Sequence, residues 1–310
     1  MAIHQLEVRP GTVTQIFSRD TPAVLAVDPG DTVVVQSLDA SGHLEPQSFP
    51  GEVRPLMFTD RRGHCLTGPI EVRGAQPGDM LSVSFEALTP GDWGFTVAGR
   101  RDDAFTRSLG VAGGEPGWLL WELDRERRTG TNQFGHTVQL RPFLGVVGMP
   151  QPEAGEFSTT PPRAAGGGNI DCRELVAGST LFLPVTVPGA LLSVGDGHAA
   201  QGDGEVGGTA IECPMTSRLV LGLEPDPPLQ AIHAVTPGAR ITFGFNADLN
   251  AATAEALGAM LTWLQALLGL SRTHALALAS SVVDLRITQI ANETWGVHAV
   301  LADDAVVRNS

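Results

Sequence analysis

The sequence contains no lysine and no tyrosine, and all 20 of its basic residues are arginine. Without lysine the chain cannot form a Schiff base, attach pyridoxal phosphate or supply the lysine of a phosphate-binding loop. Any hydrolase mechanism that depends on a catalytic lysine is excluded for the same reason. The absence of one residue type therefore removes several common enzyme classes before any motif is considered.

Cysteine, basic charge and long apolar runs are also scarce. Cys65, Cys172 and Cys213 are odd in number and far apart, which argues against a disulfide framework and for a reducing compartment. The formal net charge is −14 and no basic patch is present, so we expect no nucleic-acid partner. The N-terminus lacks the apolar core of a signal peptide, and no apolar run reaches the length of about 18 residues that spans a membrane. We expect a soluble, cytoplasmic protein with no membrane partner.

Short runs rich in Val, Leu and Phe dominate the first four-fifths of the chain. These expected strands lie at 32–38, 80–88, 136–148, 179–187, 217–223 and 239–245. Pro-Gly precedes several of them, in DPGD, QPGD and TPGA, and this dipeptide is typical of type II turns. Many short strands separated by such turns predict a mainly β fold, sandwich- or barrel-like and of jelly-roll type.

The character of the chain changes from Asp248 onward. The Ala- and Leu-rich run 248–270 has helical periodicity, with Asn250 as its expected N-cap, and a second helix is expected to begin at Ser271. Two strands are expected after these helices. The chain is therefore predicted to comprise a β-rich domain and a smaller C-terminal α+β part.

We place the boundary so that residues 1–245 form the β-rich domain and carry the site, while residues 246–310 form the α+β part. The two can also pack into one compact unit. Within the first domain, residues 149–168 are rich in Pro, Gly and small polar residues, which indicates a long surface loop. This loop leads directly to Asn169 and Asp171.

The run SVGDGHAAQGDGEVGGT contains few apolar side chains although apolar runs flank it on both sides. Its Asp196 and His198 are two residues apart, so on an extended chain their side chains leave the same face. That is suitable geometry for two ligands of one metal ion, and a solvated glycine-rich turn is the alternative. Glu205 is a candidate third ligand or general base, while Asp203 is expected to stabilise a turn.

Other polar residues are candidates for the same site. Asn169 and Asp171 also alternate to one face if extended, and Asp171 is either a ligand or an orienting partner of His198, unless the segment is a plain turn. Asp39 lies near His43 at the end of an expected strand, where it serves a site or an ordinary turn.

The roles of Glu71, Glu212, Cys172 and His298 stay open at this stage. A Cys–His nucleophile is a competing hypothesis because Cys172 directly follows Asp171, but it needs a proximity in space that the sequence does not give. The chain has no Gly-x-Ser-x-Gly nucleophile motif.

Together these segments resemble the acetamidase/formamidase family. GGNIDCRELVAGSTLFLPVTVPGALLSVGDGHAAQGDGEVGGTAIECP carries the family's GGN-x-D run, its Gly-Ser strand, GDxHAAQGDGE and TAIE in order. TGPIEVRGAQPGDML, LDASGHL, DLRITQIAN and GVHAVL resemble further segments of the family. The resemblance spans nearly the whole chain, although the residues before Asp39 match only loosely.

The resemblance implies hydrolysis of small linear amides such as formamide or acetamide to a carboxylate and ammonia. It also implies a divalent metal, zinc or calcium. Carried across, Asp196 and His198 are metal ligands, Asp39 adds a carboxylate and Glu205 is a ligand or base. Asn169 and Asp171 then complete the floor of the site. The missing lysine separates the chain from amidases with a Ser–Ser–Lys or Glu–Lys–Cys triad.

The leading hypothesis is therefore a metal-dependent amide hydrolase that acts on a small-molecule amide. The alternative is a non-catalytic β module that binds calcium, although His198 argues against it because imidazole suits zinc better than calcium. The resemblance and the many β edges also predict a symmetric homo-oligomer, a dimer or higher.

Overall fold

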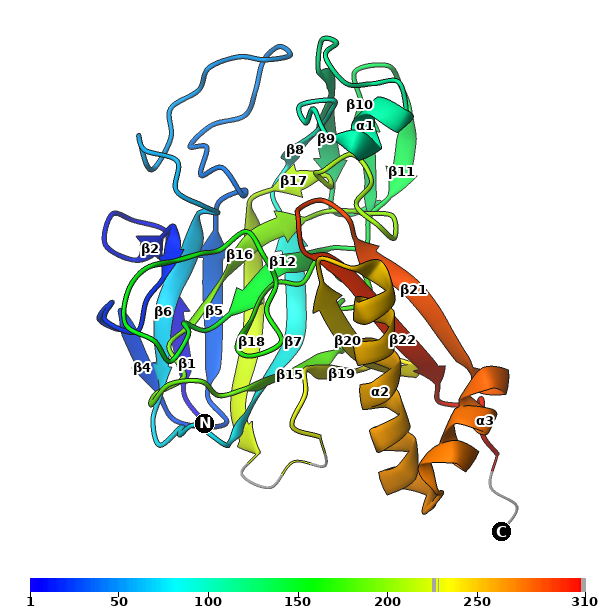
Figure 1. Cartoon of the computed structure of the whole chain (residues 1–310). Coiled ribbons are helices and arrows are strands. Elements are labelled where there is room, and N and C mark those ends of the chain that lie inside the picture. Colours follow the sequence, from blue (N-terminus) through cyan, green and yellow to red (C-terminus); the bar gives the residue numbers. More distant parts are fainter. Residues whose placement is uncertain (225–226, 228, 308–310) are drawn as a thin grey trace.

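A computed structural model describes residues 1–224, 227 and 229–307, and two large β-sheets form most of it (Figure 1). The first sheet has nine strands within the described residues. Their order is β1 (Ile3–Leu6), β5 (Thr32–Ser37), β18 (Met215–Glu224), β7 (Met80–Pro90), β15 (Thr180–Pro184), β19 (His233–Thr236), β20 (Ala239–Asn246), β22 (Trp295–Ala302) and β21 (Val283–Gln289).

The second sheet has eleven strands in the same part of the chain. Its main path runs β11 (Thr137–Gln139), β10 (Thr129–Asn132), β9 (Gly117–Asp124), β8 (Trp93–Ala98), β17 (Glu212–Cys213), β16 (Leu192–His198), β12 (Phe143–Gly148) and β14 (Gly167–Asn169). Off this path, β6 (Leu66–Val72) pairs with β16, and both β2 (Val13–Thr14) and β4 (Leu25–Val27) pair with β6. A small separate sheet joins β3 (Ile16–Phe17) and β13 (Phe157–Ser158).

The two large sheets share one apolar core. Val33 and Leu81 from the first sheet lie in the same buried cluster as Ile70 and Val194 from the second. On β7 buried and more exposed positions alternate over much of the strand, as expected for a strand with one face on a core. The prediction of a mainly β, sandwich-like fold is confirmed.

The Pro-Gly turns form as the sequence predicts. Gly30, Gly78 and Gly238 all have positive φ, which the third position of a type II turn requires. The expected strand at 136–148, however, is split into β11 and β12. Pro142 lies in the break, where a residue without an N–H cannot continue the ladder.

The C-terminal α+β part is also confirmed. Helix α2 (Leu249–Leu268) is capped by Asp248, whose side chain accepts a hydrogen bond from the backbone N–H of Asn250. The prediction of Asn250 as N-cap is therefore wrong, because the helix begins two residues earlier. Helix α3 (Arg272–Val282) is capped by Ser271 as expected. The remaining helix, α1 (Ala104–Ser108), lies between β8 and β9 in the sequence.

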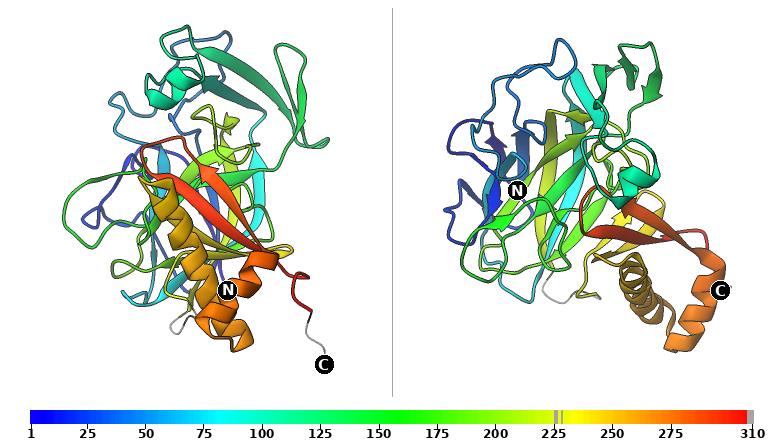
Figure 2. Two further views of the ribbon diagram at one scale, coloured as in Figure 1. Left: turned by 45° about the vertical axis from the view of Figure 1, so that its right-hand side comes forward. Right: turned by 45° about the horizontal axis from the view of Figure 1, so that its top comes forward.

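The C-terminal strands extend the nine-stranded sheet, since β22 pairs with β20 over eight residues. Helix α2 lies against these strands (Figure 2). By length and composition α2 is apolar enough to cross a membrane, but core helices of soluble proteins pass the same test. The division at residue 245 stays a prediction, and the last three residues of its second part lie outside the described residues.

Candidate active site and metal centre

The polar run begins on β16, a strand that is buried along its whole length. This strand pairs with β17 on one side and with β12 on the other, and β12 pairs in turn with β14. Asp196 and His198 lie on β16, Glu212 lies directly opposite His198 on β17, and Asn169 ends β14 just before Asp171. Neighbouring strands therefore gather side chains that are far apart in sequence.

Asp196, His198 and Glu212 form the first ligand group. Nε2 of His198 lies 3.3 Å from Oδ1 of Asp196 and 3.3 Å from Oε1 of Glu212. Zinc bonds of about 2.0–2.1 Å to nitrogen and oxygen, arranged tetrahedrally, place such ligand atoms about 3.3 Å apart. The three side chains are buried, so their spacing suits one small cation between them.

Unpaired polar atoms support a metal at this place. Among the described residues, both ring nitrogens of His198, Oδ1 of Asp196 and Oε2 of Glu212 are buried without a hydrogen-bond partner. Buried polar atoms are normally hydrogen-bonded, and leaving them unpaired costs free energy. The donor set of one imidazole and two carboxylates also matches known divalent-metal sites. The residues present therefore fit the metal that the family resemblance implies.

Asp171 and Glu205 form a second group with the same histidine. One ligand atom from each of Asp171, His198 and Glu205 lies within 4.8 Å of the others. Both carboxylate oxygens of Asp171 are buried without a hydrogen-bond partner in the described structure, and so is Oδ1 of Asn169. The segments that the sequence predicts to share a site are thus brought together around His198.

The backbone is strained at this site. Asp171, Asp196 and Glu205 have φ of 55°, 58° and 44°, in the left-handed region that non-glycine residues rarely adopt. Each such residue costs about 1 to 3 kcal/mol, and such outliers cluster at functional sites. The strain also means that Asp196 does not sit on a regular extended chain. The sequence predicts that Asp196 lies near His198, but it does so by assuming a regular extended strand, which the backbone does not form at Asp196.

Gly145 of β12 forms the floor beneath these side chains. A Cβ atom at this position would lie 2.7 Å from Oδ1 of Asp171, 2.9 Å from Cε1 of His198 and closer still to Oδ2 of Asp196. Its carbonyl oxygen accepts hydrogen bonds from the backbone N–H groups of Ile170 and Asp171. The absence of a side chain here therefore leaves room for the site, while the carbonyl fixes the turn that carries Asp171.

Charge in the site is unbalanced, because four buried carboxylates surround one imidazole. Burial raises the pKa of Asp171 and of Glu205 well above their usual values, and the charge of Asp171 raises the pKa of Glu205 further. Burial also raises the pKa of Glu212 to about 7, against the opposing charge of His198. Uncompensated buried charge is costly, so protons or a metal cation must neutralise this cluster.

The pKa values of His198 and Asp196, both on β16, are shifted so that each residue favours its charged form. Burial by itself would lower the pKa of His198, but the charges of Asp196 and Glu212 raise it well above its usual value. Burial would raise the pKa of Asp196, but the charges of His198 and His64 lower it. The pair therefore favours an ionised Asp196 beside a cationic partner, whether imidazolium or metal.

A cavity of about 400 Å³ opens onto the site. We call its buried lining residues, Asn169, Asp196, Glu205 and Glu212, the cavity floor, and its more exposed lining residues, His64, Arg61, Arg62 and Arg100, the cavity wall. Arg62 pairs with Glu156, and Arg100 lies over the ring of Trp118. The floor is thus acidic and the wall basic, in a space of the size that small-molecule sites have.

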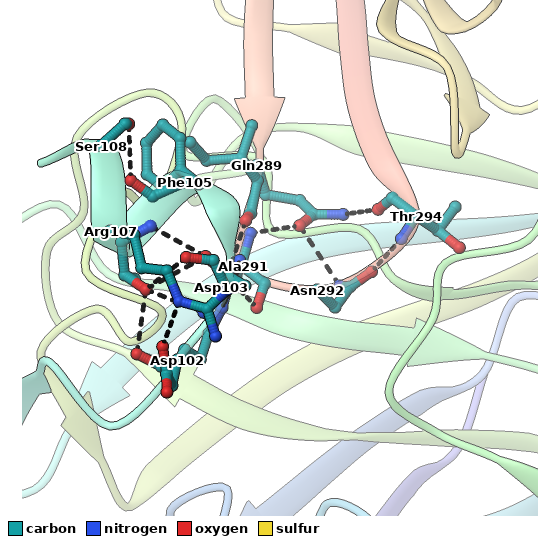
Figure 3. A network of polar contacts seen from close by, with 12 residues as sticks. Asp102, Asp103, Phe105, Arg107, Ser108, Gln289, Ala291, Asn292 and Thr294 are labelled. Carbon is teal, nitrogen blue, oxygen red and sulfur yellow. Dashed lines mark hydrogen bonds and ion pairs between the residues drawn. The ribbon is translucent and has the colours of Figure 1, made fainter. Parts of the chain in front are cut away.

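The loop between β21 and β22 forms part of the rim, and Figure 3 shows its hydrogen bonds. Gln289 accepts from the N–H of Ala291 and donates to the carbonyl of Thr294, while Arg101, near α1, donates to the carbonyls of Ile290 and Ala291. The same loop holds the polar run. Gly204 donates to the carbonyl of Thr288 and accepts from the N–H of Ile290. The C-terminal part therefore fixes the turn that carries Glu205.

Asp39 has its own hydrogen-bond partners, apart from those of this cluster. Its side chain is fully buried and accepts hydrogen bonds from the backbone N–H groups of Ser41 and His43, and it pairs with Nδ1 of His43 at 3.0 Å. No ligand group among the described residues includes it. These hydrogen bonds fit the ordinary turn role, one of the two roles that the sequence left open for Asp39. Asp203 is exposed in a turn, as expected.

Three residues of the site have no role predicted from the sequence. Glu212 follows an apolar run, and only its pairing opposite His198 reveals it. Nε2 of His64 lies 4.0 Å from Oδ2 of Asp196, although nothing around it in the sequence suggests a site. Gly145 sits in an apolar strand, and its effect is visible only from the side chains above it.

The sequence profile of the acetamidase/formamidase family matches residues 10–154 and 152–224. The chain belongs to this family. The predicted enzyme class, amidohydrolases that act on linear amides, is confirmed with it. The crystal structure of an acetamidase from Bacillus halodurans superposes with a TM-score of 0.84, at 28% identity, over 96% of this chain and 97% of that one.

Curated relatives are equally distant in sequence. An acetamidase of Mycolicibacterium smegmatis is 28% identical over 60% of this chain and 59% of its own length. A formamidase of Methylophilus methylotrophus is 27% identical over 63% of this chain and 60% of its own length. The chain therefore spans about three-fifths of these two relatives.

Proposed function

We propose that this protein hydrolyses a small linear amide to a carboxylate and ammonia, with a divalent metal in the cavity floor. The observation that supports this most directly is the set of four buried carboxylates around His198 beside a cavity, three of which, Asp171, Asp196 and Glu212, have oxygens without a hydrogen-bond partner in the described structure. The names of the relatives add formamide- and acetamide-like substrates as the expected class.

Asp196, His198 and Glu212 would hold the metal, since their ligand atoms are the most closely spaced. This set retains two of the residues predicted from the sequence and replaces Asp39 with Glu212. When bound, a divalent metal polarises the amide carbonyl and lowers the pKa of a bound water. The imidazole at the centre of the set favours zinc over calcium.

Asp171 and Glu205 would move the protons. Both are buried beside each other, and burial raises the pKa of both, so the pair holds one proton more readily than two isolated carboxylates would. The ionised member takes a proton from the attacking water. The protonated member then gives one to the leaving nitrogen, without which an amide C–N bond breaks slowly. Glu205 lines the cavity and is our candidate for the group that contacts water.

Asn169 would orient the substrate. Its side-chain oxygen is buried without a partner in the described structure, and the residue lines the cavity floor. A carbonyl oxygen there can accept a hydrogen bond from the amide N–H₂ group. The cavity volume also leaves space for an acyl group larger than formyl or acetyl, and the arginines in its wall suit a substrate with an anionic end.

A non-catalytic calcium-binding module is the competing function. Calcium takes six to eight oxygen ligands, whereas the central atom of the first ligand group is an imidazole nitrogen. A module without turnover also has no need of a cavity that ends on unpaired carboxylates. The arrangement therefore favours the enzyme.

Ammonia release from a panel of amides tests this proposal. The panel runs from formamide and acetamide through longer acyl amides to amides with a terminal carboxylate, each with and without chelator, beside elemental analysis of the protein. We expect turnover that chelator abolishes and zinc restores. Metal-loaded protein that releases no ammonia from any amide, but gains thermal stability from calcium, would instead support the module.

We further propose that the protein is a cytoplasmic homo-oligomer, as the sequence predicts. Strand β21 is the edge of the nine-stranded sheet, and its Leu285 and Ile287 are 46% and 41% exposed. Open edges with apolar side chains favour pairing with another chain. Sedimentation of wild type beside Leu285→Glu tests this proposal, and a monomeric wild type would contradict it.

A further inference from the structure

A second cluster of ligand-type side chains lies outside the cavity floor. Cys172 and Glu174 lie in the segment after β14, and His298 lies on β22. Sγ of Cys172 and Nε2 of His298 are each 3.4 Å from Oε2 of Glu174, and all three atoms lie within 4.8 Å of one another. Cys172 and His298 are fully buried, and the side chain of Glu174 is 12% exposed.

His298 points an unpaired nitrogen into this cluster. Its Nδ1 lies 2.9 Å from Oγ1 of Thr288, while Nε2 is buried and makes no hydrogen bond in the described structure. Thr288 thus anchors one side of the ring and leaves the other available. This is how metal-bound histidines are usually oriented, with the second nitrogen held by a polar partner.

The spacing fits a tetrahedral site. Zinc bonds of about 2.3 Å to sulfur, 2.0 Å to oxygen and 2.0 Å to nitrogen place sulfur and oxygen about 3.5 Å apart, and nitrogen and oxygen about 3.3 Å apart. The corresponding distances are both 3.4 Å. A thiolate and an imidazole select zinc and related metals and disfavour calcium and magnesium.

Glu174 has one carboxylate oxygen that is available to a cation. Arg286 donates to Oε1 of Glu174 at 2.9 Å, which leaves Oε2 directed at Cys172 and His298. On binding, the metal displaces the thiol proton of Cys172, and the resulting thiolate and the carboxylate of Glu174 balance its two positive charges.

We propose that Cys172, Glu174 and His298 form a second metal site, selective for zinc and related cations. The site joins β22 to the segment after β14, two parts of the chain more than 100 residues apart. Because Asp171 directly precedes Cys172, a metal here also fixes the base of the turn that carries Asp171.

Cobalt binding to the full-length protein tests the proposal independently of amide turnover. Metal-free protein is titrated with Co²⁺ alone, and the thiolate-to-cobalt charge-transfer absorption and the bound stoichiometry are recorded. We expect wild type to show the absorption and to bind a second equivalent of cobalt beyond that of the cavity floor. Cys172→Ser should lose the absorption and that equivalent, while Cys65→Ser, a change at another buried cysteine, should keep both.

His298→Gln gives a second variant, because a glutamine can still bond Thr288 but offers no imidazole. It should also lose the second equivalent, and Zn²⁺ should displace cobalt from wild type. Wild-type protein that binds cobalt with no charge-transfer absorption would overturn the proposal. An absorption that persists in Cys172→Ser would overturn it as well. Neither result bears on the amidase proposal, which depends on the cavity floor.

Discussion

Two clusters of polar side chains share the segment 171–174. They differ in which of their polar atoms have hydrogen-bond partners. We call Asp171, Asp196, His198, Glu205 and Glu212 the cavity cluster, and Cys172, Glu174 and His298 the closed cluster. The cavity cluster opens onto a cavity and contains three residues with positive φ. The closed cluster lines no part of that cavity, and its residues are held by Thr288 and Arg286.

This difference distinguishes a cluster that suits a reaction from a cluster that suits a structural role. Strained backbone and unpaired carboxylates around a cavity cost stability and are maintained where a substrate must react. A cluster that is held by its neighbours and excluded from the cavity suits a structural ion. Two further acid–imidazole pairs, Asp39–His43 and Asp31–His4, have their carboxylates satisfied by backbone N–H groups and serve as comparisons.

The largest effect is expected from His198→Ala, because it removes the central ligand of the cavity cluster. Loss of the metal's contribution of several kcal/mol should lower kcat/KM by about 10⁴-fold or more. Metal content should fall by the equivalent assigned to the cavity floor. His4→Ala, at the satisfied Asp31–His4 pair, is the control and should keep both. If His198→Ala keeps its full equivalent of metal, the cavity cluster does not differ from the satisfied Asp31–His4 pair as we expect.

Glu205→Gln should lower kcat by about 10³-fold while metal content stays unchanged. Glutamine keeps the shape of the side chain but cannot carry the proton. Asp203→Asn, two residues away in the exposed turn, is the matched control and should retain wild-type kcat. Near-normal turnover by Glu205→Gln would indicate that Asp171, and not Glu205, transfers the proton. Loss of metal instead would make Glu205 a ligand.

Gly145→Ala tests whether the cavity cluster needs its bare floor. The added methyl group would collide with the carboxylates of Asp171 and Asp196, so we expect metal affinity to fall by about 10- to 100-fold. Overpacking should also lower the free energy of unfolding by about 1–3 kcal/mol. Gly114→Ala has open space around it and is the control. Wild-type affinity in Gly145→Ala would show that the floor can move.

Asp39→Asn should separate a turn from a ligand. Asparagine cannot accept as many hydrogen bonds from Ser41 and His43, so we expect a loss of about 1–3 kcal/mol of stability by chemical denaturation. Metal content should be unchanged. A loss of metal without a loss of stability would restore Asp39 to the ligand set that the sequence predicts.

The smallest effect is expected at Asp31, whose contribution to stability is lost only at acid pH. The N–H of Ala2, followed by His4, lowers the pKa of Asp31 from 3.8 to about 2. A depressed pKa stabilises the folded state above the unfolded value, so this contribution is lost as pH falls from about 4 to about 2. Asp31→Asn should flatten the pH dependence of the free energy of unfolding in that window and slightly lower that free energy at neutral pH, where the contribution of Asp31 is fully present. An unchanged acid transition would contradict the assignment.

Much of the fold was predictable because it depends on local patterns. The Pro-Gly turns require positive φ, apolar runs mark the strands, and the helical periodicity after Asp248 gave α2 and α3. The break at Pro142 was missed, because the apolar pattern continues across a proline that cannot donate to the ladder. The cap at Asp248 was misjudged, because it depends on which side chain accepts the N–H of Asn250. The short strands β2, β3 and β4 have too few residues for any periodicity to show.

The candidate site was predictable only in part. Asp196 and His198 are two residues apart, so any strand places them near each other, and the glycine-rich run marks them as unusual. Glu212 could not be assigned, because its role depends on the antiparallel register of β16 and β17. Asp39 lies at a strand end like a site residue, but its own turn satisfies both oxygens.

By itself the sequence determined the reaction class and the family. The absence of lysine excludes every mechanism that needs a catalytic lysine. The order of the motifs along the chain identifies the family without any knowledge of how the strands pair. Tertiary structure alone decided which acids meet His198, that Gly145 must lack a side chain, and that Cys172 faces His298 across more than 100 residues. The physical reason is that these properties depend on distances between atoms from different strands. Strand register and sheet packing fix such distances, and no local pattern encodes them.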